Sequence, residues 1–262
     1  MPSTDFEGKN VLITGIGSGI GLETARQFSK RGARIVGVDR TKDKLDEAIS
    51  SLHVHGPKHV TLVKDLGTVS AAKGVVKEAL AEVDYIDIVV NSAGVCHFTK
   101  MSEISEEEYN DVMDVNVRAL YFISVAVAES MTATRGGRII NLGSNAGRKG
   151  RALSAHYAAS KAAVKNITES LALAYASKKI AVNTVCPGPT DTPMWEENFR
   201  GLKTITGKDA KEFWEIWKQQ TPLGRTGSAE DVANLICFLA SDKGSFINGQ
   251  EINVCGGFML TS

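Results

Sequence analysis

The chain has 262 residues, of which 43% are hydrophobic and 23% charged, and its 30 Lys and Arg residues balance 30 Asp and Glu residues. This composition is typical of one globular α/β domain and excludes a disordered chain, and the lack of a basic excess argues against nucleic acid as a partner. No apolar run approaches the roughly 18 residues of a membrane span, and no signal-peptide pattern opens the chain. We therefore expect a cytoplasmic protein without a membrane partner.

Short apolar runs rich in Val and Ile alternate with longer amphipathic segments along the chain. Seven strands are predicted, over residues 10–15, 33–39, 59–65, 86–94, 136–144, 180–188 and 250–257. The helices predicted between them cover residues 21–32, 41–52, 68–83, 106–131, 154–177 and 228–240. Because strands that are apolar throughout are covered on both faces, the alternation predicts a doubly wound, mostly parallel seven-stranded sheet with helices on both faces.

One stretch, residues 189–227, interrupts this alternation and contains all three tryptophans and three of the six prolines. Folds of this class bind ligands beyond the carboxyl ends of their strands, and the stretch follows such an end. We therefore interpret residues 1–262 as a single domain with a substrate-binding insertion at about 189–227. A helical excursion over the surface is the alternative interpretation.

The first predicted strand runs directly into the segment TGIGSGIG at residues 14–21. Gly15 would allow a tight turn, Gly19 a close approach of the backbone to a pyrophosphate, and Gly21 the packing of helix against strand. The next helix offers free N–H groups and a positive dipole end, and Ser18 and Ile20 lie in the same turn. The segment predicts a dinucleotide site, with a plain tight turn as the alternative.

Asp39 ends the second predicted strand, 18 residues after Gly21. A carboxylate at this place accepts hydrogen bonds from an adenosine ribose and repels a 2′-phosphate, which predicts NAD as the cofactor. Arg40 could instead pair with that phosphate, but no Lys or Arg in residues 15–21 would assist it. Asp39 could also simply cap the next helix, a role that Thr41 could fill as well.

Two more strand ends are expected on the same side of the sheet. Asp65 and Leu66 end the third strand, where a carboxylate could accept from an adenine amino group. Asn91, Ala93 and Gly94 belong to the NSAG turn after the fourth strand, which would let a flat ring lie against the backbone. Both segments are cofactor-site candidates, and each could also be a plain turn.

Tyr157 and Lys161 stand four residues apart in the Ala-rich predicted helix SAHYAASKAAVKNI. Side chains at this spacing share a helix face, with Cβ atoms about 6 Å apart, so the ammonium would lower the pKa of the phenol from its ordinary value of about 10. Such a phenol is a base suited to a secondary alcohol, and Ser144 at the end of the preceding strand could hold the substrate oxygen. The alternative is an exposed Tyr and Lys on a solvated helix face.

The order of these segments resembles the short-chain dehydrogenase/reductase family. The matching segments are the glycine motif at 15–21, NSAG at 91–94, Asn116 in DVNV, Ser144, Tyr157xxxLys161 and PGPTDTPM at 187–194. The resemblance runs from about Lys9 to Gly257 and implies a single Rossmann domain, hydride transfer between a nicotinamide and an alcohol or ketone, and usually a homotetramer. Cys255 departs from the pattern, because the family usually has an Asp there.

The same resemblance implies roles for individual residues. The catalytic group that it implies is Asn116, Ser144, Tyr157 and Lys161. The residues that it implies near the nicotinamide are Pro187, Gly188, Thr190 and Thr192. Asn116 would hold a water that relays a proton behind Lys161, and Thr192 would bond the nicotinamide carboxamide, to which Thr190 would add its backbone.

The substrate pocket is predicted to draw on three segments and to be lined by Ser144, Asn145, His97, Leu153, His156, Met194 and Trp195. Two histidines, an Asn and a Trp suit a small, partly polar secondary alcohol such as a polyol, sugar alcohol or diol. PMWEE followed by PLGR also resembles the family members that act on polyols, acetoin and butanediol.

Three functions stay open at this point. The first is an NAD-dependent dehydrogenase of a small secondary alcohol, with Tyr157 as acid and base. The second is a 3-oxoacyl-thioester (acyl carrier protein) reductase, which would normally prefer NADPH and fits Asp39 poorly. The third is a dinucleotide-binding protein without catalysis, which the intact catalytic group disfavours.

Metal binding and self-association can also be assessed from the residues. His53, His55 and His59 have no carboxylate or cysteine close by, so no metal site is predicted. The helices predicted over 106–131 and 154–177 carry broad Ala-rich faces that a single helix layer on the sheet would not bury. We therefore expect them to pack against a second subunit, and the resemblance extends this expectation to a homotetramer.

Overall fold

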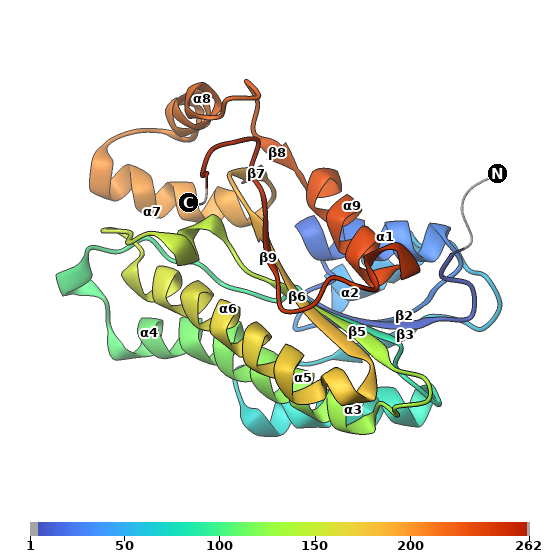
Figure 1. Ribbon diagram of the computed structural model, residues 1–262. Coiled ribbons are helices and arrows are strands. Elements are labelled where there is room, and N and C mark those ends of the chain that lie inside the picture. Colours follow the sequence, from blue (N-terminus) through green and yellow to red (C-terminus); the bar gives the residue numbers. More distant parts are fainter. Residues whose placement is uncertain (1–4, 261–262) are drawn as a thin grey trace.

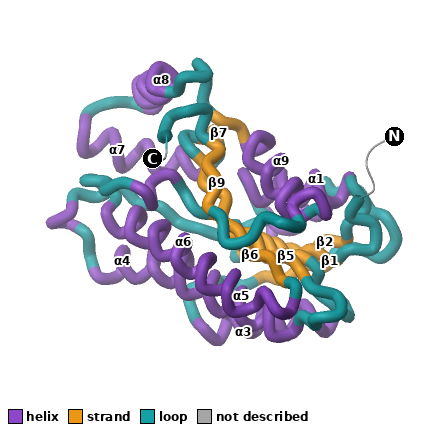
Figure 2. The backbone as a smooth tube through the Cα atoms, viewed as in Figure 1, coloured by secondary structure: helices purple, strands orange, loops and turns teal. Residues whose placement is uncertain are grey.

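The computed structural model describes residues 5–260, apart from the side chain of Glu197, and places one twisted sheet between two layers of helices (Figures 1 and 2). The strands of this sheet are β1 (Asn10–Thr14), β2 (Arg34–Asp39), β3 (Val60–Val63), β4 (Ile88–Asn91), β5 (Gly137–Leu142), β6 (Ile180–Pro187) and β9 (Glu251–Val254). They lie in the order β3-β2-β1-β4-β5-β6-β9 and every neighbouring pair is parallel. The predicted doubly wound, seven-stranded sheet is confirmed.

Alternate residues of each strand face different helix layers, as the period of a strand requires. One layer consists of α1 (Gly19–Lys30), α2 (Lys42–Ser50) and α9 (Ala229–Ala240), and the other of α3 (Val69–Glu82), α5 (Leu120–Ser130) and α6 (Ala155–Tyr175). Val11 and Ile13 of β1 belong to the apolar core under the first layer, whereas Leu12 belongs to the core under the second. Two cores, one on each face, therefore fix the sheet between the helices.

The helix predicted over 106–131 is not continuous. It consists of α4 (Glu106–Met113), a π-helical turn over Asp114–Ala119, and α5. The side-chain amide of Asn116, inside that turn, accepts from the N–H of Val95 at 2.8 Å and donates to the carbonyl oxygen of Val95 at 2.9 Å. The wider turn lets a helical side chain bond the neighbouring loop in this way, and such π-bulges often mark functional sites.

Strands β4 and β5 end earlier than predicted. Residues 86–94 were expected to be strand throughout, but only Ile88–Asn91 pairs, and of residues 136–144 only Gly137–Leu142 pairs. The residues that follow these strands, Ser92–Gly94 and Gly143–Ser144, form loops at the carboxyl edge of the sheet. These loops are free to line a ligand site because their backbone is not committed to the sheet.

The insertion at 189–227 forms two amphipathic helices, α7 (Met194–Thr206) and α8 (Ala210–Gln220), beyond one end of the sheet (Figure 1). Two short parallel strands, β7 (Thr190–Asp191) and β8 (Gly227–Ser228), close its base. The helices and the chain beneath them share a cluster of aromatic rings from Phe98, Trp195, Phe199, Phe213, Trp214 and Trp217. Within residues 5–260, no helix is both long and apolar enough to cross a membrane.

Candidate active site

A cavity of about 510 Å³ runs along the carboxyl edge of the sheet, from the turn after β1 to α7 and α8. Parallel strands bring their carboxyl ends to one edge, so residues far apart in the sequence meet there. The predicted site residues that line the cavity are Gly15, Ser18, Gly19, Ile20, Gly21, Asp39, Arg40, Asp65, Leu66, Ala93, Gly94, Ser144, Asn145, Tyr157, Lys161, Pro187, Gly188, Thr190, Thr192, Met194 and Trp195.

The turn between β1 and α1 fits the phosphates of a dinucleotide. A Cβ atom on Gly21 would lie 2.1 Å from the carbonyl oxygen of Gly15, so only glycine allows the helix to start this close to the strand. Ser18 occupies the N-cap position of α1 without capping the helix through its side chain. The N–H groups of the first turn are therefore available to an anionic ligand.

Asp39 joins this turn to the end of β2. Its Oδ2 accepts from the N–H of Gly17 at 2.9 Å and its Oδ1 from the N–H of Thr41 at 3.0 Å, and the residue lines the cavity. The alternative that Asp39 caps the next helix is not what the structure shows, because Thr41 occupies the N-cap position of α2 and Asp39 bonds that end of the helix only through the N–H of Thr41. Gly17 is not among the predicted residues, although a Cβ there would lie 2.7 Å from Oδ2 of Asp39. The sequence feature that could have identified Gly17 is its place as a further glycine within the same turn.

Cations also line this end of the cavity, namely Arg40, Lys44 and Lys64. Lys64 is paired with Glu78 at 2.8 Å. Residues 15–21 contain no Lys or Arg, but Lys44 reaches this end of the cavity from the first turn of α2. The adenosine end therefore offers both an acceptor for a ribose diol and cations for a 2′-phosphate.

Tyr157 and Lys161 line the cavity from one face of α6, and Ser144 lines it from the loop after β5, where its hydroxyl acts to lower the pKa of Tyr157. Nζ of Lys161 donates to the carbonyl oxygen of Leu142 at 2.8 Å and lies 5.7 Å from the centroid of the Tyr157 ring. The structure thus brings the three groups together around one point of the cavity. The alternative of a solvated Tyr and Lys does not agree with this placement.

The acid–base properties of the two groups differ from the prediction. Burial raises the pKa of Tyr157 above its ordinary value, against the hydrogen bond of Ser144 and the positive charge of Arg151, which lower it. Burial also lowers the pKa of Lys161 to about 8. The predicted lowering of the Tyr157 pKa by Lys161 is therefore wrong for this structure, because burial is the largest influence on the Tyr157 pKa and raises it.

Asn116 lies beside the cavity without lining it. Besides its two bonds to Val95, its amide donates to Oγ of Ser160 at 3.1 Å, so it joins the π-helical turn to α6 and to the loop after β4. A Cβ placed on Gly94 would lie 3.2 Å from its Oδ1 and 3.6 Å from Nζ of Lys161. Asn116 is therefore close to Lys161, but its amide holds the loop rather than Lys161 itself.

Asn91 does not belong to the cavity. Its amide nitrogen donates to Ser124 at 2.9 Å and to Asn141 at 2.8 Å, and both contacts are buried. Alternate strand residues face opposite sides of the sheet, so this last residue of β4 points under the helices while the turn after it faces the ligand side. Asn91 is thus a structural residue, which corrects its prediction as a cofactor contact.

The two histidines predicted for the substrate pocket also lie outside the cavity, as does Leu153. His156 precedes Tyr157 on α6, and one residue of helix turns the side-chain direction by about 100°. The buried imidazole of His156 lies 3.1 Å from Glu108 of α4 and stacks on His97 at 6.4 Å between ring centroids. His97 in turn lies 3.0 Å from Asp111. The stack links α4 to α6, which corrects the prediction that these histidines line the substrate pocket.

Several cavity residues are absent from the prediction: Cys96, Phe98, Arg151, Asn198, Phe213 and Trp217. The aromatic composition of the insertion indicated that rings of α7 and α8 could line a site. The spacing of these rings in the sequence does not show which of them face the cavity. Arg151 had no signal, because it stands in a Lys- and Arg-rich segment that reads as solvated surface.

Comparisons with known proteins agree with this geometry. A family model described as enoyl-(acyl carrier protein) reductase matches residues 15–259. The 3-oxoacyl-[acyl-carrier-protein] reductase of Escherichia coli is 33% identical over 98% of this chain and 99% of its own length. A short-chain type dehydrogenase/reductase from Mycobacterium marinum has a TM-score of 0.87 and 29% identity, over 98% of both chains.

A further solved structure comes from Beutenbergia cavernae and is described as a candidate NAD(P)-dependent gluconate 5-dehydrogenase with bound NADP. It has a TM-score of 0.85 and 31% identity, over 98% of this chain and 99% of that chain. These similarities extend over nearly the whole chain and not over its dinucleotide site alone. The chain therefore belongs to the short-chain dehydrogenase/reductase family, as a nicotinamide-dinucleotide-binding oxidoreductase of Rossmann fold.

Proposed function

We propose that this protein transfers a hydride between NAD and a small secondary alcohol or its ketone, with Tyr157 as the acid and base. The observation that carries the proposal is that Ser144, Tyr157 and Lys161 line the wall of the same cavity, with Lys161 one helical turn from Tyr157. A polyol, sugar alcohol or diol is the substrate type that the sequence favoured. The insertion at 189–227 would bind it, because Met194 and Trp195 line the same cavity.

The chain's own groups account for the proton that such a reaction moves. In oxidation, Tyr157 takes the proton of the substrate hydroxyl while Ser144 donates a hydrogen bond to the same oxygen. A bound nicotinamide would supply the acceptor for the hydride of the carbinol carbon. In reduction, Tyr157 returns its proton to the carbonyl oxygen, and its raised pKa keeps it protonated for this step at neutral pH. Lys161, held by Leu142, supplies positive charge near the phenolate of the oxidation step.

The cofactor preference is proposed from Asp39, whose carboxylate stands where a ribose diol would be held. Arg40 and Lys44 support NADP as the second candidate, since both line the same end of the cavity. Titration of the protein with NADH and with NADPH separates the two. Tighter binding of NADPH would contradict the proposal, and Arg40→Ala should then be the variant that weakens it.

A 3-oxoacyl-thioester reductase is the second candidate function, favoured by the 33% identity to the Escherichia coli reductase. Following NADH absorbance with polyols, diols and hydroxy acids on one side and a 3-oxoacyl thioester on the other distinguishes the two functions. Turnover of the thioester alone would overturn the alcohol proposal. No turnover of any alcohol or ketone would favour a dinucleotide-binding protein without catalysis.

Self-association is proposed from the outer surface of the second helix layer. Tyr121 of α5 and Leu173 of α6 are exposed there, at 43% and 83% of their surface. Large apolar side chains on one layer support burial in a symmetric interface, and with the family resemblance this supports a homotetramer. Light scattering at micromolar protein concentration tests it, since a monomer would contradict the proposal.

Tyr157→Phe tests the catalytic assignment directly. Loss of the general acid–base group should lower kcat by roughly 100- to 10,000-fold while the affinity for NADH stays unchanged. Tyr175→Phe is the matched control, because Tyr175 lies on the same helix and bonds Glu129, away from the cavity. A Tyr157→Phe enzyme with near-normal kcat would refute the role of Tyr157.

A further inference from the structure

Arg151 lies on the cavity wall, in the connection between β5 and α6, and its positive charge acts on Tyr157. Its one hydrogen bond to a described residue is weak, since Nη2 approaches Oδ1 of Asn145 at 3.5 Å. Among residues 5–260, with the side chain of Glu197 left aside, no carboxylate pairs with it. The guanidinium is thus positioned at the catalytic end of the cavity with no opposite charge on it.

Arg148, three residues earlier in the same connection, shows a structural arginine for comparison. Its Nη2 lies 2.9 Å from the carboxylate of Glu251 and donates to the carbonyl oxygen of Glu251 at 2.8 Å. These contacts tie the connection to β9, and Arg148 does not line the cavity. Because Arg148 already anchors this segment, the charge of Arg151 is available to a ligand.

The two carboxylates among the described lining residues stand at the other end of the cavity. They belong to Asp39 at the end of β2 and Asp65 after β3. In the sheet, β5 lies three strands from β2, which separates their ends by about 14 Å at the usual strand spacing. Asp39 and Asp65 therefore cannot neutralise Arg151, and the catalytic end has a positive charge without an acid.

The wall that the loop after β4, α7 and α8 contribute is mostly apolar, with Asn198 of α7 as a polar member. Its apolar lining residues are Phe98, Met194, Trp195, Leu202, Phe213 and Trp217. A guanidinium that loses water beside such a wall is destabilised unless an anion joins it, and a ligand can supply that anion. The catalytic end is therefore suited to a molecule that is negatively charged at one side and apolar at the other.

We propose that the substrate is a hydroxy acid or the corresponding oxo acid, with its carboxylate on Arg151 and its apolar part against Trp195 and Trp217. The inference rests on the proposed function, since the carbinol carbon must lie beside Tyr157. A planar guanidinium binds a carboxylate through two parallel hydrogen bonds, which would orient the reacting carbon as well as hold it. A neutral polyol would leave Arg151 without a partner, so this class replaces the polyol as the expected substrate.

The test measures binding, independently of turnover, on the full-length protein saturated with NAD. Isothermal titration calorimetry compares phenylacetate, which has a carboxylate and a ring, with the neutral phenylacetamide. We expect the wild type to bind phenylacetate roughly tenfold or more tightly than the amide. Arg151→Gln should abolish this preference and Arg151→Lys should restore part of it. Lys149→Gln, an exposed neighbour, should leave the preference unchanged.

Each outcome decides a separate point. Equal affinities for acid and amide in the wild type, or an intact preference in Arg151→Gln, would overturn the inference, provided that the variant binds NADH normally. Phenyl phosphate as a third ligand distinguishes the source of the anion, and Arg151-dependent binding tighter than that of phenylacetate would replace the carboxylate by a phosphate ester. Tyr157→Phe should keep the phenylacetate preference, so failure of the proposed catalysis shows up only in kcat and not in this measurement.

Discussion

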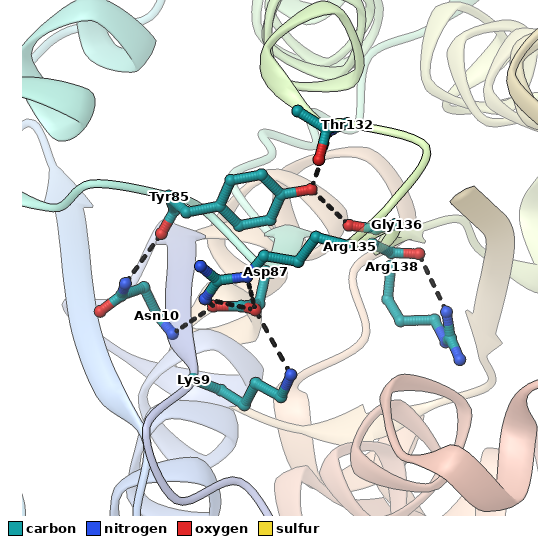
Figure 3. A network of polar contacts seen from close by, with 9 residues as sticks. Lys9, Asn10, Tyr85, Asp87, Thr132, Arg135, Gly136 and Arg138 are labelled. Atoms are coloured by element: carbon teal, nitrogen blue, oxygen red, sulfur yellow. Dashed lines mark hydrogen bonds and ion pairs between the residues drawn. The ribbon is translucent and has the colours of Figure 1, made fainter. Parts of the chain in front are cut away.

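At the amino edge of the sheet, the buried carboxylate of Asp87 accepts from the N–H of Asn10 at 3.0 Å and from Nε and Nη2 of Arg135 at 3.1 Å, with Lys9 at 3.4 Å (Figure 3). The hydroxyl of Tyr85 in the same network donates to a carbonyl oxygen at 2.6 Å, and its ring lies under Arg135. At the carboxyl edge, by contrast, Arg151 and Lys161 have no carboxylate partner among the described residues.

The contrast shows how one sheet divides stability and function between its two ends. Charges at the amino edge satisfy one another, so they hold the loops around β1, β4 and β5 together. At the carboxyl edge, the burial that lowers the pKa of Lys161 is a cost to the fold. Parallel strands put all carboxyl ends on one side, so unpaired polar groups collect there and the opposite edge is left to stabilise the fold.

Among substitutions that test this difference between the two edges, we expect Lys161→Met to have the largest effect, which is on turnover. We expect kcat to fall by roughly 100-fold or more, since the phenolate loses its neighbouring charge. Stability at pH 7 should rise by about 1–3 kcal/mol, because the folded-state pKa of about 8 lies below the ordinary 10.5 and the buried charge disfavours folding.

This gain depends on pH in a defined direction. The unfolded chain binds the proton of Lys161 more tightly, so wild-type stability rises between about pH 8 and 10.5 and the advantage of the variant shrinks there. Urea unfolding at pH 7 and pH 10 measures it. Lys165→Met, one turn further along α6 and half exposed, is the control and should change little. A variant less stable than wild type at pH 7 would contradict the prediction.

Asp87→Ala should lower the stability of the fold and leave turnover unchanged. Removing a buried carboxylate leaves Asn10 and Arg135 without their acceptor, and because the cationic partners are half exposed we expect a loss of about 2–4 kcal/mol. Thermal unfolding measures this loss, and kcat of the folded protein should not change. Asp46→Ala, which removes an exposed ion pair within α2, should cost less than about 0.5 kcal/mol. Equal effects of the two variants would remove the distinction between the edges.

The pH dependence of the reaction gives a smaller, directional effect. Oxidation requires deprotonated Tyr157, whose pKa is raised by burial, so kcat/KM for oxidation should rise about tenfold per pH unit through the neutral range. Reduction requires the protonated phenol, so its kcat/KM should stay flat between about pH 6 and 8. Initial rates in both directions over that range test this. A flat oxidation profile would mean that another group takes the proton.

The smallest effect is expected for Asn116→Leu, which removes three hydrogen bonds between the π-helical turn, Val95 and Ser160. We expect kcat to fall about tenfold, because the loop beside Lys161 is held less firmly, and melting to occur a few degrees lower. Asn110→Leu on the exposed face of α4 is the matched control. A loss of stability with unchanged kcat would assign Asn116 to the fold alone.

Features that depend on residues close together in the chain could be predicted from the sequence, and features that depend on distant residues could not. Runs such as Val11–Ile13 are apolar at every residue because both faces of the sheet are covered. The succession of strands along the chain and the fold class could therefore be predicted from the sequence. Tyr157 and Lys161 could be found because their spacing lies within one helix. His156 was misplaced for the same kind of reason: adjacency in sequence suggested a shared pocket, while the helix turns it toward Glu108.

The alternating elements, the glycine turn at 15–21 and the helical spacing of Tyr157 and Lys161 follow from residue order alone, because each depends on local backbone geometry and on the period of apolar residues. Which groups lose water and which charges find partners depends instead on the packing of the whole fold. It turned Asn91 under the helices, carried Lys44 to the adenosine end, raised the pKa of Tyr157 and left Arg151 unpaired at the catalytic end. Burial and charge pairing depend on segments far apart in the chain, so residue order alone does not specify them.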